Sequence, residues 1–492
     1  MKISNFNDIK LLFFDNRTLK QTIFKNTFWI ALAIGVSKFS KLVLIIYVAR
    51  ILGATEYGKF AFALAFISLF VIFHNLGLPS IVTREFAREK EKEKEFYSLF
   101  SLKILLGLGA LIMVLIGSFF VTPDPNIRKV IWILATFSLI GNFSTIIHAF
   151  FRARQRMEYE SWATILEALI VAGAGFFVIL KFPSIENLSY AYLFSSVIAL
   201  VFILIFFHFK VFPLKISWQK SVWRKFLTMS WPLALASVFS TIYAYIDSVM
   251  MGYWGLMTET GWYNAAYKMV MFTTVPASII ATSFYPVLSK FFKESKEKLQ
   301  SAWDQQVGVM IFLAIPLMVG GITLSARIID FIYGQDFFPS ILAFQILIIM
   351  AGIFFLSKPL MQFLIVSNQQ KKIFVISFSG ALINIILNLI LIPKFSLYGA
   401  AIATVITYLL MLFLLFNFTF RFTPVRPLNL KLFFSFIIAG LSSIVMYSVI
   451  SQSQIYNLNV FLSISIGAII YFIAFFGLNF ISKSLKLYAF NK

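Results

Sequence analysis

Long apolar runs separated by short polar segments recur along the whole chain. Each run covers about 18 to 25 residues, enough to cross a hydrocarbon layer of roughly 30 Å at about 1.5 Å of helical rise per residue. The pattern predicts fourteen membrane-spanning helices, at residues 27–50, 59–81, 97–121, 130–151, 161–180, 189–208, 226–251, 262–288, 302–326, 340–366, 373–392, 398–417, 431–450 and 458–481.

The composition supports an all-α integral membrane protein. Hydrophobic residues make up 60% of the chain and charged residues 13%, with a mean hydropathy of +0.88. Soluble chains carry roughly 45–50% apolar and about 25% charged residues. Cysteine is absent, which excludes disulfides and thiol chemistry. The three histidines are isolated in the sequence, so we expect no metal site, and we expect no cofactor.

The basic residues alternate between successive polar segments. If the N-terminus is cytoplasmic, about 30 of the 42 basic residues lie inside and about 7 outside, a bias of the kind that orients membrane proteins. We therefore expect a multi-pass protein of the cytoplasmic membrane with both termini in the cytoplasm. The formal charge of +22 is explained by this anchoring, without a nucleic-acid partner.

Weak internal similarity relates the two halves of the chain. A stretch beginning at Phe28 aligns with one beginning at Ser230, which places Gly53 on Gly255 and Gly58 on Gly261. Six predicted spans separate the two stretches, and an even number makes the repeats parallel. The alignment predicts two six-helix lobes. We expect Gly53 and Gly58 to lie in a tight external turn, because glycine adopts positive φ readily.

The repeat and the charge pattern together predict the organisation of the chain. Two lobes in one chain make a monomer sufficient, and the last two spans are an addition outside the repeat. The predicted parts are a cytoplasmic N-terminal segment at 1–26, an N-lobe at 27–208, a cytoplasmic linker at 209–225, a C-lobe at 226–417, spans 13 and 14 at 431–481, and a cytoplasmic tail at 482–492.

Several stretches resemble one transporter family. They are ARILGATEYGKFAFA (Ala49–Ala63), NLGLPSIVTREFAR (Asn75–Arg88), IYAYIDSVMMG (Ile242–Gly252), GWYNAAYK (Gly261–Lys268) and IPKFSLYGAAIAT (Ile392–Thr404). The chain resembles the Wzx-type polysaccharide or O-antigen unit flippases of the multidrug/oligosaccharidyl-lipid/polysaccharide (MOP) superfamily. The resemblance implies translocation of polyprenyl-diphosphate-linked oligosaccharide units for surface polysaccharide synthesis. It implies as partners the lipid-linked oligosaccharide and membrane lipids, with polysaccharide polymerase and assembly proteins as further candidates.

Charged residues inside apolar spans are candidate functional residues, because each costs roughly 2.5 to 3.5 kcal/mol at the centre of a membrane helix. Lys38 and Lys41 share one face of span 1, roughly 15 and 20 Å from its start. We hypothesise that their ammonium groups bind the pyrophosphate of the substrate. The alternative is that they pair with a carboxylate such as Glu167 or extend along the helix to the membrane surface.

Three further charges lie within predicted spans of the second half. Asp247 and Lys268 both fall in the outer half of neighbouring spans, where an ion pair or a role in gradient coupling is the expectation. Lys358 precedes a proline in span 10 and is a weaker candidate for the cavity.

Four arginines form a candidate basic mouth on the cytoplasmic side. Arg84 and Arg88 follow span 2, and Arg152 and Arg154 follow span 4. Arginine binds phosphate through its forked donors, so these residues are candidates for capturing the substrate from the inner leaflet. The alternative is ordinary anchoring by positive charge at the cytoplasmic surface.

The sequence favours transport over catalysis. The leading hypothesis is alternating access through a cationic central cavity. The chain lacks the G-x-x-x-x-G-K-[ST] phosphate loop, so a gradient or consumption of the product must drive it. A gradient-driven drug antiporter of the same superfamily is the alternative, although it would favour acidic cavity residues. A membrane enzyme of polysaccharide assembly is less favoured, because no carboxylate cluster or long external loop is visible. We expect no catalytic residues.

Overall fold

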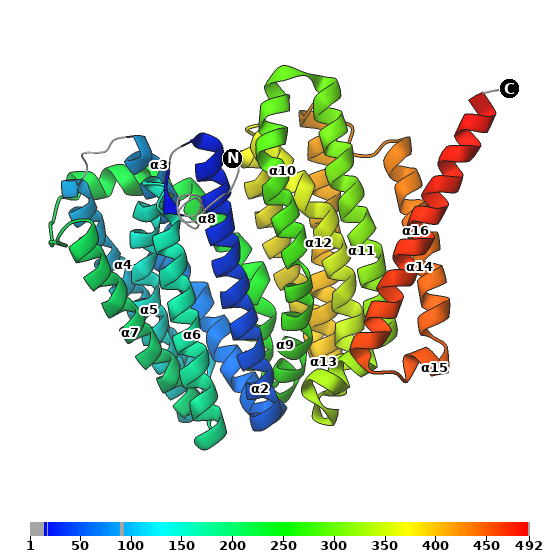
Figure 1. The fold of residues 1–492 in the computed structure, drawn as a ribbon. Helices are drawn as coiled ribbons and strands as arrows, with labels where there is room; N and C mark the ends of the chain where they lie inside the picture. The colour runs from blue at the N-terminus through cyan, green and yellow to red at the C-terminus, as the bar shows by residue number, and fades with distance from the viewer. Residues whose placement is uncertain (1–13, 17, 89–92, 491–492) are drawn as a thin grey trace, which may run out of the picture. The chain divides into compact units, whose positions relative to one another are not determined.

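The computed structural model describes residues 14–490 except residue 17 and residues 89–92, and this described part is almost wholly helical and contains no strand (Figure 1). The helices are α2 (Leu19–Asn75), α3 (Leu78–Arg88), α4 (Glu93–Val121), α5 (Pro125–Ala153), α6 (Met157–Lys181), α7 (Ile185–Lys210), α8 (Lys220–Tyr253), α9 (Met257–Thr273), α10 (Val275–Glu294), α11 (Lys296–Tyr333), η1 (Gln335–Phe337), α12 (Ser340–Val366), α13 (Gln370–Phe422), α14 (Leu430–Ile450), α15 (Ser453–Tyr456) and α16 (Val460–Phe490).

The helices confirm the predicted all-α membrane architecture. Within the described residues, 12 helical segments are long and apolar enough to cross a membrane. Two of them are double: α2 has 57 residues and breaks at Gly53, and α13 has 53 residues and breaks at Ser396. Counting these as two spans each accounts for the fourteen predicted spans, because 12 plus 2 is 14.

The turn at Gly53 has a counterpart in the second repeat. Gly53 and Gly255, which the internal alignment pairs, both have a φ of 76°. Glycine adopts positive φ without the steric penalty of a Cβ atom. The shared backbone conformation at two aligned positions supports the parallel repeat predicted from the sequence. Gly58 lies in the helix that follows the turn rather than in the turn itself.

Gly58 and Gly261 allow the two turns to pack backbone against backbone. A Cβ atom on Gly58 would lie 1.7 Å from the backbone oxygen of Met257, and one on Gly261 would lie 2.0 Å from that of Ala54. The hydroxyls of Thr55 and Thr258 are 2.7 Å apart beside this contact. Small residues permit such close helix approach in lipid. Any larger residue at Gly58 must separate the segments.

Gly58→Ala should therefore lower the stability of the protein by roughly 1–3 kcal/mol, the usual cost of overpacking. Gly173→Ala is the matched control, because Gly173 is also helical and its Cβ would meet nothing within 4 Å. That control should gain up to about 1 kcal/mol from helix propensity. Thermal unfolding in detergent measures both variants, and equal midpoints would contradict the close packing.

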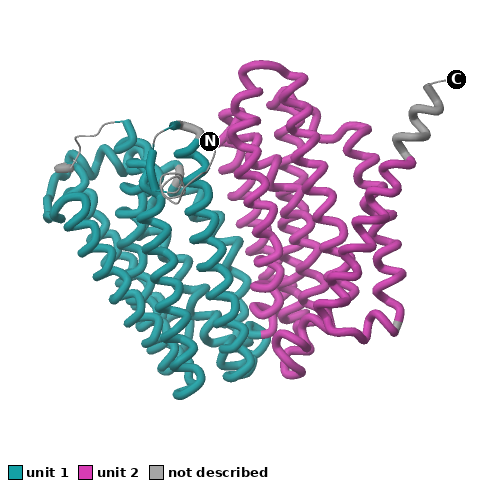
Figure 2. Tube along the Cα trace, viewed as in Figure 1, with its two compact units in different colours: residues 1–261 teal, residues 262–492 magenta. Residues whose placement is uncertain are grey.

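The chain forms two compact units, residues 1–261 and 262–492 (Figure 2). The seventh span, α8, belongs to unit 1 and packs against α2. The boundaries predicted from the sequence for the two lobes, the linker and the tail stay a prediction. Residues 1–13 of the predicted N-terminal segment lie outside the described residues.

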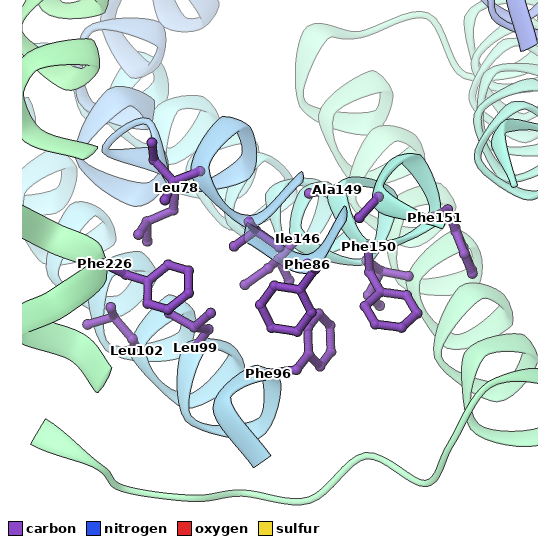
Figure 3. Close-up of a cluster of buried hydrophobic side chains, with 14 of the residues drawn as sticks. Leu78, Phe86, Phe96, Leu99, Leu102, Ile146, Ala149, Phe150, Phe151 and Phe226 are labelled. Atoms are coloured by element: carbon purple, nitrogen blue, oxygen red, sulfur yellow. The ribbon is translucent and has the colours of Figure 1, made fainter. Parts of the chain in front are cut away.

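An aromatic core holds one end of unit 1 together (Figure 3). The ring of Phe96 on α4 lies 5.3 Å from that of Phe150 on α5 and 5.4 Å from that of Phe207 on α7. Phe86 of α3 packs against Phe96, and Phe226 of α8 packs against Phe86. Aromatic pairs at such distances add about 0.5–1.5 kcal/mol beyond area burial. This core fixes α3 against α5, where the candidate arginines are located.

A buried ion pair fixes the start of α2 to the start of α6. Lys25 Nζ lies 2.8 Å from Glu158 Oε2, with 0% and 2% of the two side chains exposed. Lys25 also donates to the backbone oxygen of Gln155 at 3.2 Å, and Arg156 lies 3.3 Å from the other Glu158 oxygen. The pair is satisfied on both sides, as a buried pair must be to repay desolvation. It fixes the turn between α5 and α6.

Candidate substrate-binding site

Lys38 and Lys41 are exposed on α2, in the middle of the first predicted span. Neither lysine has a hydrogen bond or direct ion pair among the described residues. Charged side chains within membrane helices almost always face a bundle interior or a water-filled cavity. Exposure at this depth therefore makes the two ammonium groups available to a ligand.

Glu167, which the sequence suggested as a possible partner of the two lysines, is half-buried on α6. It interacts electrostatically with Lys41, although no direct ion pair joins the two within the described part of the chain. Its Oε1 lies 3.8 Å from the position of a Cβ on Gly141 of α5. One carboxylate thus offsets part of the charge of two lysines, and a net positive charge remains.

Arg84 and Arg88 lie on α3, an amphipathic helix. Its apolar residues pack into the aromatic core, which leaves the arginine side chains 50% and 69% exposed. Glu85, between them, lies 3.1 Å from Arg84 Nε and 3.9 Å from Arg88 Nη1. The helix amphipathicity therefore explains why both guanidinium groups point away from the core.

The structure brings the other two arginines to the same end of unit 1. Thr83 of α3 donates a hydrogen bond to the backbone oxygen of Ala149 on α5, at 3.2 Å. Arg152 Nε contacts Glu160 at 2.9 Å, and Arg154 lies over the Phe150 ring at 5.2 Å. Arg84 and Arg88 thus contact Glu85, and Arg152 contacts Glu160. We call these four arginines the α3/α5 arginine cluster.

The remaining predicted residues are divided between the two units. Asp247 is buried in unit 1, and Lys268 is half-buried in unit 2, so their pairing stays a prediction. Lys358 of unit 2 is half-buried, with its Nζ over the Phe354 ring at 5.5 Å. The described residues contain no group of three His, Cys, Asp or Glu side chains that could hold a metal ion.

Lys103 on α4 is a buried cation that was not among the residues predicted from the sequence. Its side chain is fully buried, and its Nζ donates to the backbone oxygen of His74 at 3.0 Å and to Asn75 Oδ1. The Asn75 amide in turn donates to Asn142 Oδ1 at 3.0 Å. His74 and Asn75 are the last two residues of α2, and the free carbonyls at this end carry the partial negative charge of a helix C-terminus. The position of this lysine inside an apolar run was the available signal.

Unit 2 contains an apolar cavity of about 490 Å³. It is lined by residues of α9, α11, α12, α14 and α16, almost all with hydrocarbon or aromatic side chains. Phe312, Met446 and Tyr471 are among them, and they also belong to or contact a cluster that joins α11 to the last two spans. We call it the α11/α16 cavity. Its chemistry suits a hydrocarbon chain.

Comparison with known proteins gives a consistent set of relatives. The family model described as "Polysaccharide biosynthesis protein" matches residues 23–292. A probable low-salt glycan biosynthesis flippase of Haloferax volcanii is 22% identical over 74% of this chain and 76% of its own length.

Solved structures show the same fold. The chain is similar to a lipid II flippase in an inward closed conformation, with a TM-score of 0.76 and 18% identity over 90% of this chain and 97% of the other. It is also similar to an inward-facing multidrug resistance transporter of the MOP superfamily, with a TM-score of 0.66 and 15% identity over 79% and 96%. At these identities, the similarities show a shared fold.

Proposed function

Because the chain belongs to the polysaccharide biosynthesis protein family, whose model matches more than half of it, we propose that it is a flippase of lipid-linked oligosaccharides. The substrate that we propose is an oligosaccharide unit on a polyprenyl diphosphate, moved across the cytoplasmic membrane for surface polysaccharide synthesis. The flippase named among its relatives supports this class of activity. We propose transport without catalysis.

The observation that carries this proposal is the pair of exposed lysines on α2, in the middle of the first predicted span. A pyrophosphate brings two or more negative charges into a low-dielectric region, where opposite charges interact much more strongly than in water. Lys38 and Lys41 lie three residues apart and so share one helix face. They are our candidate binding site for the diphosphate.

The α11/α16 cavity supports a lipid substrate. Its lining offers hydrocarbon contacts along α11 and the last two spans, where part of a polyprenyl chain would be buried. A soluble sugar phosphate would gain nothing from such a cavity.

The α3/α5 arginine cluster is our candidate for the first contact with substrate. In the orientation that we propose, with both termini in the cytoplasm, it lies at the inner surface of the membrane. The exposed guanidinium groups of Arg84 and Arg88 would attract the diphosphate from the inner leaflet. The same residues contribute to positive-inside anchoring, and both roles need the charges.

A drug antiporter is the second candidate, because the fold is also similar to that of a multidrug resistance transporter. An organic cation would be repelled by Lys38 and Lys41, whose charges Glu167 offsets only in part. The lipid-linked anion therefore fits the described charges better. We propose that the protein acts as a monomer in the cytoplasmic membrane and that its products pass to polymerase and assembly proteins.

Ligand-induced stabilisation separates the two candidates. At about 100 times its dissociation constant, a ligand stabilises a protein by about 2.7 kcal/mol. We expect polyprenyl-diphosphate oligosaccharide to raise the unfolding midpoint in detergent, and an organic cation such as ethidium to leave it unchanged. Stabilisation by the cation alone would favour the antiporter.

A further inference from the structure

A second, more polar cavity of about 360 Å³ lies at the C-terminal end of α11 in unit 2. Its lining includes Arg327 and Asp330, one helical turn apart, and Asn459 just before α16. We call it the Arg327 pocket. In the orientation proposed above, α11 runs from the cytoplasmic to the external surface, so this pocket lies at the outer leaflet.

In the described part of the chain, the N–H donors of Arg327 have no hydrogen-bond acceptor. Its guanidinium lies over the ring of Tyr456 on α15, with its carbon 5.3 Å from the ring centroid. The side chain is half-buried, and Nη1 is buried without a hydrogen-bond acceptor. Among the described residues, no hydrogen bond or ion pair of this arginine is present, even with Asp330. A buried, unpaired charged donor is costly, which indicates that an external acceptor completes the site.

The Arg327 pocket continues into the α11/α16 cavity. Phe331 and Val460 line both cavities, so the two volumes meet at these side chains. A molecule that fills both must be polar and anionic at one end and hydrocarbon at the other. Arginine binds phosphate oxygens through its fork of N–H groups while its face stacks on an aromatic ring.

We infer that the Arg327 pocket binds the phosphate of a membrane amphiphile whose hydrocarbon chain occupies the α11/α16 cavity. Arg327 donates to the phosphate oxygens, and Tyr456 holds the guanidinium plane in place by stacking. Asp330 lies in the same pocket and is exposed, so it favours a phosphate that carries a cationic substituent such as ethanolamine. The ligand is either a membrane phospholipid or the phosphorylated carrier of the transported sugar.

Lipid retention in native mass spectrometry tests the site on the full-length protein. The probes are phosphatidylethanolamine, phosphatidylglycerol, a polyprenyl monophosphate and inorganic phosphate, each titrated into purified protein in detergent. Arg327→Gln should weaken retention of phosphate lipid by about tenfold or more, the loss expected for one charge-assisted contact. Arg128→Gln is the matched control, because the Arg128 guanidinium also stacks on an aromatic ring, at 4.8 Å from Phe119, but lines neither cavity.

A second variant tests the hydrocarbon end and covers a folding failure of the first. Ala468→Trp places a large ring in the α11/α16 cavity and should weaken retention of the same lipids without touching Arg327. Inorganic phosphate should not compete, because it lacks a chain to bury.

The outcomes separate the two sources of the ligand. Preference for phosphatidylethanolamine over the polyprenyl phosphate identifies a membrane phospholipid, and this result holds even if the proposed flippase function fails. Preference for the polyprenyl phosphate identifies the carrier and rests on that function. Unchanged retention in Arg327→Gln and Ala468→Trp, or competition by inorganic phosphate, would overturn the inference.

Discussion

A Lys38→Gln, Lys41→Gln double variant should translocate lipid-linked oligosaccharide at least tenfold more slowly than the unaltered protein. The substitution keeps a polar side chain of similar length and removes two positive charges from the middle of the first span of α2. Charge-assisted hydrogen bonds contribute about 1.5–3 kcal/mol each, and about 1.4 kcal/mol corresponds to a factor of ten. Initial rates in proteoliposomes that contain equal amounts of each protein measure the effect.

The matched control is Lys181→Gln with Lys210→Gln. These two lysines are also exposed and lie in unit 1, but at the C-terminal ends of α6 and α7. The control removes the same total charge from the helix ends and should keep the rate within about twofold, as surface substitutions usually change little. Equal slowing of the two double variants would mean that overall charge, rather than the position on α2, supports transport.

The largest effect on stability is expected for Asn75→Leu. This substitution removes one of the two described acceptors of the buried Lys103 ammonium and leaves the backbone oxygen of His74. Removing one partner of a buried charge costs about 3–5 kcal/mol. The midpoint of thermal unfolding in detergent should fall accordingly.

Adding Lys103→Met to the same chain should restore part of the loss. Methionine fills a similar volume and needs no acceptor, so the double variant should be more stable than Asn75→Leu alone. The coupling of neighbouring residues makes the two effects non-additive. If the double variant were instead less stable than Asn75→Leu, the ammonium would not be the source of the cost.

The sequence predicted the features that depend on local patterns. The fourteen spans follow from the length of the apolar runs, and the turn at Gly53 was predicted correctly, although Gly58 lies in the following helix. The four arginines of the α3/α5 arginine cluster were candidates because they follow two spans on the side rich in basic residues, and their role in binding substrate stays a prediction.

Features that depend on long-range contacts were not predicted. Lys25 and Glu158 are separated by 133 positions, and nothing in either segment identifies the other as its partner. Lys103 is paired with a helix C-terminus and an amide rather than with a carboxylate, so a search for opposite charges does not find its partners. The Arg327 pocket combines residues of α11 with Asn459 and Val460, which lie more than 120 positions further along the chain.

The most direct test of the central claim is translocation by the unaltered protein in proteoliposomes. A fluorescent polyprenyl-diphosphate oligosaccharide is reconstituted into both leaflets, and a membrane-impermeant glycosidase or lectin reports the sugar that reaches the outer leaflet. We predict that the inner pool becomes accessible much faster than in vesicles without protein. An unchanged rate, together with efflux of an organic cation from the same vesicles, would contradict the flippase function and favour the antiporter.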